Sequence, residues 1–113
     1  MTHSELYDAA HNAGIKAGEA CVPTPMTVVG GGQEYYVEGG VCGFAWVGSI
    51  NGNSSFGRWL KKTGKGSKGY PSGMSIWVYE FGQSMTRKSA YAGAFARVLR
   101  EGGVKCYPGS RMD

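Results

Sequence analysis

The last third of the chain carries the pattern that most constrains its fold. Residues 75–80 are apolar on both faces, which is typical of a central β-strand. Residues 84–101 have apolar side chains at helical spacing, Ser84 is suited to cap the first turn, and the Gly-Gly pair at 102–103 can end the helix. A second strand is expected over residues 104–107. A strand, a helix and a strand with such short connections predict a right-handed parallel crossover.

The remainder of the chain predicts further helices and strands. Thr2 and Glu5 have the spacing of a capping box, which places a helix start near His3. The expected elements are a helix over residues 3–20, a hairpin of strands 27–29 and 35–38, a strand over 41–50, a helix over 54–62 and a loop over 63–73. Large and small side chains alternate along 41–50, so its small-residue face should be closely covered. The order α-β-α-β-α-β predicts a single-domain α/β sandwich over residues 1–113.

Length and composition limit the classes of protein to which the chain can belong. Its 113 residues suffice for one domain with a modest core. The three cysteines, Cys21, Cys42 and Cys106, lack the close pairing of a metal or redox motif, so free thiols in a reducing cytoplasm are expected. We find no apolar signal core and no apolar run of membrane-spanning length. The net charge of +4 is compatible with a polyanionic partner.

Five phrases of the sequence are specific as strings: PTPMTV at 23–28, GVCGFAWV at 40–47, QSMTRK at 83–88, AYA at 90–92 and GSRMD at 109–113. Together they resemble a family of small proteins encoded by tailed bacteriophages and prophages. The resemblance covers most of the chain except residues 30–38. It implies an accessory protein that acts in the cytoplasm of the bacterial host. Proteins of that kind often bind nucleic acid or inhibit a host defence component, and the resemblance supplies no catalytic motif.

A basic, glycine-rich segment is the first candidate site. Five cations fall within residues 58–68, which contain no acid, and two aromatic side chains are interleaved with them or follow them. The candidate residues are Arg58, Trp59, Lys61, Lys62, Lys65, Lys68 and Tyr70. Lysines on such a loop can track phosphates and aromatic rings can stack on bases, so we expect a nucleic-acid or partner surface. The alternative is a solvated loop whose tryptophan belongs to the core.

The edge beyond the last two strands is the second candidate site. Pro108 and Gly109 are expected to end the last strand, so that residues 110–113 form a polar tail. The candidate ligand-binding residues are Gln83, Ser84, Arg87, Ser110, Arg111 and Asp113. In a parallel unit these groups share the edge where helix N-termini receive anions, and Arg111 could grip a phosphate with two hydrogen bonds. The alternative is that Ser84 only caps the helix and Arg111 pairs with a nearby carboxylate.

The residues do not indicate a catalytic or metal site. Cys42 with His3 or His11 could form a nucleophile and base, but a cysteine in an apolar strand usually behaves as an inert small hydrophobe. A structural zinc site is disfavoured because the cysteines and histidines do not come in close pairs. No catalytic residue, metal or cofactor is therefore assigned.

These observations favour binding over catalysis. The first hypothesis is a phage accessory protein that engages a host macromolecule, either a nucleic acid or a nucleoprotein defence component such as a CRISPR effector, and inhibits it by occupying its site. One alternative is a nucleotide or another small anionic ligand at the Ser84–Arg111 edge. The other is a homo-oligomer that assembles through the small-residue face of the first helix and the apolar edge at 35–37. No membrane partner is expected.

Overall fold

The computed structural model describes residues 1–22, 26–30, 33–37, 42–69 and 72–113. These residues form three helices and six strands. In chain order the elements are α1 (His3–Ala20), β1 (Met26–Gly30), β2 (Gln33–Val37), β3 (Gly43–Ile50), α2 (Ser55–Thr63), β4 (Ser67–Lys68), β5 (Met74–Trp77), α3 (Met85–Glu101) and β6 (Tyr107–Met112). The expected mixture of helices and strands is confirmed. Within these ranges no helix is both long and apolar enough to cross a bilayer.

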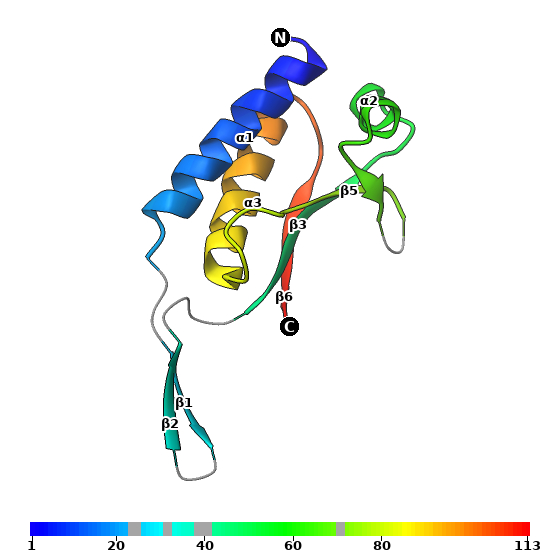
Figure 1. The fold of residues 1–113 in the computed structure, drawn as a ribbon. Helices are drawn as coiled ribbons and strands as arrows, with labels where there is room; N and C mark the ends of the chain where they lie inside the picture. The colour runs from blue at the N-terminus through cyan, green and yellow to red at the C-terminus, as the bar shows by residue number, and fades with distance from the viewer. Residues whose placement is uncertain (23–25, 31–32, 38–41, 70–71) are drawn as a thin grey trace.

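Four strands form one antiparallel sheet in the order β4-β5-β3-β6. The longest strand, β3, is central: Trp46 lies opposite Trp77 of β5, and Phe44 lies opposite Arg111 of β6. The expected hairpin is also found, because β1 and β2 pair only with each other among the described strands. Figure 1 shows this hairpin extending away from the body that the helices and the four-stranded sheet form.

The expected parallel pairing is not found among the described strands. Both β5 and β6 are antiparallel to β3, so they run in the same direction, but β3 lies between them. The unit β5-α3-β6 is therefore a split crossover that skips one strand. A crossover helix can connect adjacent strands or strands one place apart. In this sheet β3 occupies the place between them and pairs with β5 along one edge and with β6 along the other.

The expected bounds of the last strand were also wrong. β6 covers Tyr107–Met112, so Pro108 and Gly109 lie inside the strand, and residues 110–112 of the expected polar tail form its second half. Proline is tolerated there because β6 is an edge strand, where a missing N–H donor removes no pairing with an outer neighbour. The loop expected over 63–73 likewise contains the short strand β4, which pairs Ser67 with Ser75.

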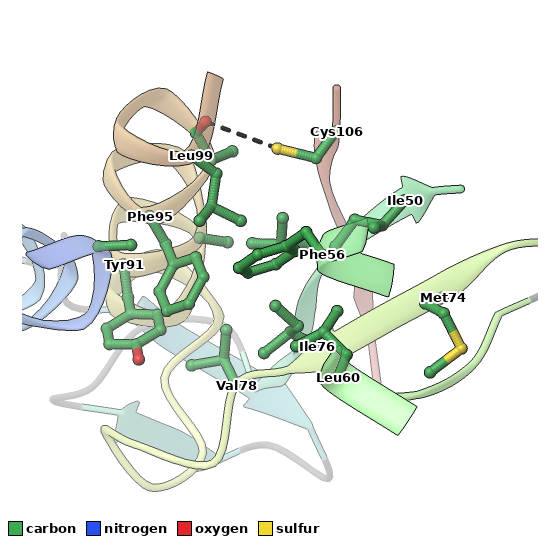
Figure 2. Packing of buried hydrophobic residues seen from close by; sticks show 14 of the residues in the cluster. Ile50, Phe56, Leu60, Met74, Ile76, Val78, Tyr91, Phe95, Leu99 and Cys106 are labelled. Carbon is green, nitrogen blue, oxygen red and sulfur yellow. Dashed lines mark hydrogen bonds between the residues drawn. The ribbon is translucent and has the colours of Figure 1, made fainter. Parts of the chain in front are cut away.

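The core lies between the sheet and its helices. α3 packs on β3 and β6, and α1 packs on α3. Figure 2 shows Phe95 and Leu99 of α3 facing Phe56 of α2, with Ile76 and Val78 below. The buried Cys106 thiol donates a hydrogen bond to the Ala96 carbonyl at 3.6 Å, and burial raises the pKa of that thiol. All three cysteines are free.

α1 starts as its capping box predicts. The Thr2 hydroxyl accepts a hydrogen bond from the Glu5 N–H, and the Glu5 carboxylate accepts one from the Thr2 N–H, which lowers the pKa of Glu5. The buried stripe of the helix is made partly of glycine: Leu6, Ala10, Gly14 and Gly18. A Cβ on Gly14 would lie 2.6 Å from Tyr91 Cδ2 of α3, so the missing side chain is what lets the two helices approach.

A polar contact also joins these two helices. His11 Nδ1 of α1 lies 2.6 Å from the hydroxyl of Tyr91 and 3.8 Å from Glu80 Oε2. Burial of the Tyr91 ring, followed by the nearby charge of Glu80, raises the pKa of Tyr91 well above its ordinary value of 10.0. Tyr91 therefore keeps its proton, and can hydrogen-bond to His11, to a higher pH in the folded state than an unfolded tyrosine does.

Gly14→Ala is expected to lower the free energy of unfolding. The added methyl overpacks the Tyr91 contact, which should cost about 1–3 kcal/mol. This cost should exceed the gain of about 1 kcal/mol that alanine brings to a helix interior. The matched control is Gly93→Ala in α3, where an added Cβ meets nothing within 4 Å and stability should rise. Urea unfolding of both variants is the measurement. Equal stabilisation of the two would contradict the close approach of α1 to α3.

Tyr91→Phe should reduce stability at neutral pH by about 1 kcal/mol through loss of the His11 hydrogen bond. It should also change the alkaline limb of the stability profile. An unfolded tyrosine ionises near pH 10 while folded Tyr91 keeps its proton, so wild-type stability falls as the pH rises above 10. The variant should lose stability less steeply there. Parallel alkaline limbs in urea titrations at several pH values would argue against the raised pKa.

Candidate functional site

The four-stranded sheet has one face on which none of the described helices packs. Along β3 the side chains of Ala45 and Val47 are buried toward the helices, whereas those of Phe44 and Trp46 are only partly buried and do not join the core cluster. This alternation is the one that the sequence predicts for residues 41–50, with the small-residue face covered. The large residues therefore lie on the other side of the sheet.

Three aromatic rings gather on this uncovered side. Trp77 of β5 is paired directly with Trp46, and their ring centroids are 5.2 Å apart with an interplanar angle of 48°. Phe44 meets Trp77 edge-on at 6.5 Å. Trp77 is 36% exposed. Rings at these separations attract one another and form a continuous aromatic surface.

Glycines make room for this surface. Gly109 of β6 lies opposite Trp46, and a Cβ there would come within 2.6 Å of the indole Nε1. Gly48 is also close, because its Cβ would lie 3.2 Å from Trp46 Cδ1. Trp46 therefore lies across neighbouring backbone and keeps its flat side near the sheet.

Cations border the aromatic surface. The Arg111 guanidinium lies 5.5 Å from the centroid of the Phe44 ring, and Lys88 Nζ of α3 lies 5.9 Å from the same centroid. Only 7% of the Lys88 residue is exposed, so its alkyl chain is packed in the fold while its amine approaches the Phe44 ring. Both distances are within the range of a cation–π contact. Two positive charges thus meet at one aromatic side chain.

A shallow hollow of about 330 Å³ lies on this side of the sheet. Its lining is formed by Trp46, Lys68, Gly69, Ser75, Trp77 and Arg111. The lining holds two cations and no carboxylate. We call the surface formed by Phe44, Trp46, Trp77, Lys68 and Arg111 the open face.

The structure divides the basic segment that the sequence singles out. Trp59 packs against Tyr7 and Phe56 at centroid distances of 5.7 and 5.5 Å, so it joins α2 to α1 and is a structural residue. Lys65 Nζ lies 5.0 Å from the centroid of the Tyr7 ring, on the same side as that cluster. These two residues therefore lie apart from the open face.

The other members of the segment also separate. Lys68 lines the hollow of the open face, and Lys61 and Lys68 both line a second cavity beside it. Arg58 and Lys62 are exposed on α2 and line neither cavity. Tyr70 lies outside the described residues. The predicted surface is thus not one patch: Lys61 and Lys68 share the second cavity, and of these two only Lys68 also lines the hollow beside Trp46 and Trp77.

The second predicted site is partly assembled through β3. The Gly43 N–H donates to the Gln83 carbonyl at 3.1 Å, Cys42 forms an isolated bridge with Ser84, and the Asp113 N–H donates to the Cys42 carbonyl at 3.0 Å. The start of α3 and the end of the chain therefore flank the same two residues. The bridging segment 42–43 stands between them.

Within that second group the side chains have different roles. The Ser84 hydroxyl caps α3 by accepting the Arg87 N–H at 3.3 Å, as the simpler interpretation expects. Ser110 is exposed on β6 opposite Ala45. Arg111 does not pair with a carboxylate in the described ion pairs and lies over Phe44 instead. Arg111 is the member that belongs to the open face.

The residues weighed for catalysis and metal binding are engaged elsewhere. His3 Nε2 lies 2.7 Å from Ser55 Oγ, and His11 Nδ1 lies 2.6 Å from the Tyr91 hydroxyl, so neither of these contacts involves Cys42. Cys42 is exposed, and it meets its neighbours through backbone hydrogen bonds. In the described ranges no three His, Cys, Asp or Glu residues are grouped so that they could hold a metal ion.

The sequence interpretation did not identify Phe44, Trp46, Trp77 and Lys88 as site residues. The alternation along residues 41–50 was a usable signal for the first two. Trp77 gave none, because residues 75–80 are apolar on both faces and were expected to be covered on both. Lys88 gave none because a lysine on a helix is normally solvated, and only packing shows that it reaches Phe44.

The open face combines one exposed and two partly buried aromatic rings with cations contributed by β4, β6 and, next to Phe44, α3. Such a surface can bind a ligand that offers flat rings together with negative charge. No family model matches the chain, and comparisons with curated proteins and with solved structures gave no match either.

Proposed function

We propose that this protein binds single-stranded nucleic acid on the open face. The observation that carries the proposal is the coincidence of three aromatic rings with cations on the side of the sheet that no described helix covers. Bases can stack on Phe44, Trp46 and Trp77 because every base has a π-face. Stacking of this kind is tolerant of sequence and contributes about 1–3 kcal/mol per base.

Charge favours a nucleic acid over a neutral apolar partner. Arg111 and Lys68 lie at the hollow, Lys88 reaches Phe44, and the hollow contains no carboxylate. A phosphodiester chain would neutralise these cations as its bases stack. A four-stranded antiparallel sheet with aromatic side chains on its uncovered face is an arrangement that other single-strand binders use to stack two or three bases.

A single strand is favoured over a duplex because the bases of a duplex already stack on one another and do not present their faces. The open face presents aromatic rings around a shallow hollow, which suits the exposed face of an unpaired base. The setting comes from the resemblance to phage proteins: the protein acts in the bacterial cytoplasm and covers a strand, free or within a nucleoprotein defence complex, that a host component needs.

Substitutions at Trp77 test the role of stacking. Trp77→Phe should retain most of the affinity for a labelled oligothymidylate, whereas Trp77→Leu should weaken it about tenfold because leucine keeps apolar area but has no π-face. Fluorescence anisotropy at low salt is the measurement. Trp77→Leu is the informative control, because an apolar protein partner or a second copy of the chain would tolerate leucine. Equal affinities for the two variants would speak against base stacking.

Salt dependence tests the role of the cations. If Arg111, Lys68 and Lys88 each neutralise one phosphate, the plot of log K against log salt should have a slope of about −2. Arg111→Ala should make the slope shallower by about 0.7, and Arg111→Lys should preserve it. Arg97→Ala removes the same charge from an exposed position on α3 where Arg97 pairs with Glu101, and should leave the slope unchanged. Identical slopes for Arg97→Ala and Arg111→Ala would mean that the salt dependence reflects the net charge of the protein and not a phosphate contact of Arg111.

A further inference from the structure

A second cavity of about 960 Å³ lies beside the open face. Its walls come from the end of β3 with the turn that follows it, from α2, and from the β4 and β5 segments. Lys61 and Lys68 line it together with polar side chains that include Ser49, Asn51 and Asn53. The lining contains no carboxylate. Two lysines among hydroxyl and amide groups form a lining that suits a phosphate.

Lys61 is oriented toward this cavity by its neighbours. It comes from the last turn of α2, and a Cβ on Gly52 would lie 3.0 Å from its Nζ, so the amine rests against the turn after β3. Its ammonium group is not part of either ion pair found in the described residues, which are His11–Glu80 and Arg97–Glu101. The positive charge is therefore available to an anion in the cavity.

The backbone of β3 is irregular where it borders the cavity. The register of β3 against β5 shifts between Val47 and Ile50, which marks a bulge, and Ser49 has φ of 62°. A non-glycine residue in this left-handed region carries strain, and such strain is concentrated at functional sites. The bulge exposes Ser49 at the cavity lining, where a regular strand would continue its pairing.

We infer that this cavity holds a phosphate of the same nucleic-acid strand, next to the nucleotides whose bases stack on the open face. The inference rests on the proposed function. Lys68 lines both the cavity and the hollow of the open face, so the two positively charged surfaces are continuous. The binding site therefore extends beyond the aromatic rings, and Lys61 recognises the phosphodiester backbone rather than a base.

The test compares fluorescein-labelled oligothymidylates of three and six nucleotides at low salt. The trimer can occupy the aromatic rings alone, and the hexamer can also reach the cavity. Lys61→Ala should weaken hexamer binding about tenfold, the effect of one hydrogen bond to a charged group, and leave trimer binding unchanged. The matched control is Lys62→Ala. Lys62 is the next residue of α2, is exposed and does not line the cavity, so loss of its charge should affect the binding of neither oligomer.

A second measurement locates the contact directly. In amide NMR spectra the hexamer, but not the trimer, should shift the signals of Ser49, Asn51 and Asn53. Equal effects of Lys61→Ala on the two oligomers, or equal effects of the Lys61 and Lys62 variants on the hexamer, would overturn the cavity inference while binding to the open face survived. Failure of both oligomers to bind would overturn the proposed function as well.

Discussion

The packing of α3 on the small-residue face of β3 is the interaction on which the rest of the structure depends. Ala45 and Val47 are fully or almost fully buried there, and Phe95 and Leu99 of the helix are fully buried beside them. Full burial of a side chain such as Val47, Phe95 or Leu99 stabilises the fold by about 1.5–3 kcal/mol. Because the helices are stacked on this one side, with α1 against α3, they leave the large aromatic residues of β3 on the other.

The same strand joins the core to the candidate site. The N–H of Gly43 and the carbonyl of Cys42 connect β3 to the start of α3 and to the last residue of the chain. Phe44 follows at once and meets cations from both directions, Lys88 from α3 and Arg111 from β6. α3 therefore contributes one of the cations next to Phe44, and the other comes from the neighbouring strand β6.

Local patterns account for what could be predicted about the fold. The capping box at Thr2, the cap at Ser84 and the alternation along residues 41–50 each act within a few residues, so each was correctly anticipated. Strand order is not a local property, because it depends on contacts between strands that are far apart in the sequence; here β3 lies between β5 and β6. The parallel pairing was wrong for that reason, and β6 was misplaced because its proline is acceptable at an edge that only the assembled sheet defines.

For the candidate site, the sequence by itself determined the supply of groups: basic residues within 58–68, arginine near the end of the chain and large aromatic residues on one side of β3. The tertiary structure alone decided how these groups are shared out. It assigned Trp59 to the packing between α1 and α2, placed Lys61 and Lys68 together at one cavity, and brought Arg111 and Trp77 to a common face. The physical reason is that charge and aromatic character belong to single residues, whereas a binding surface depends on which faces are left uncovered when the core forms.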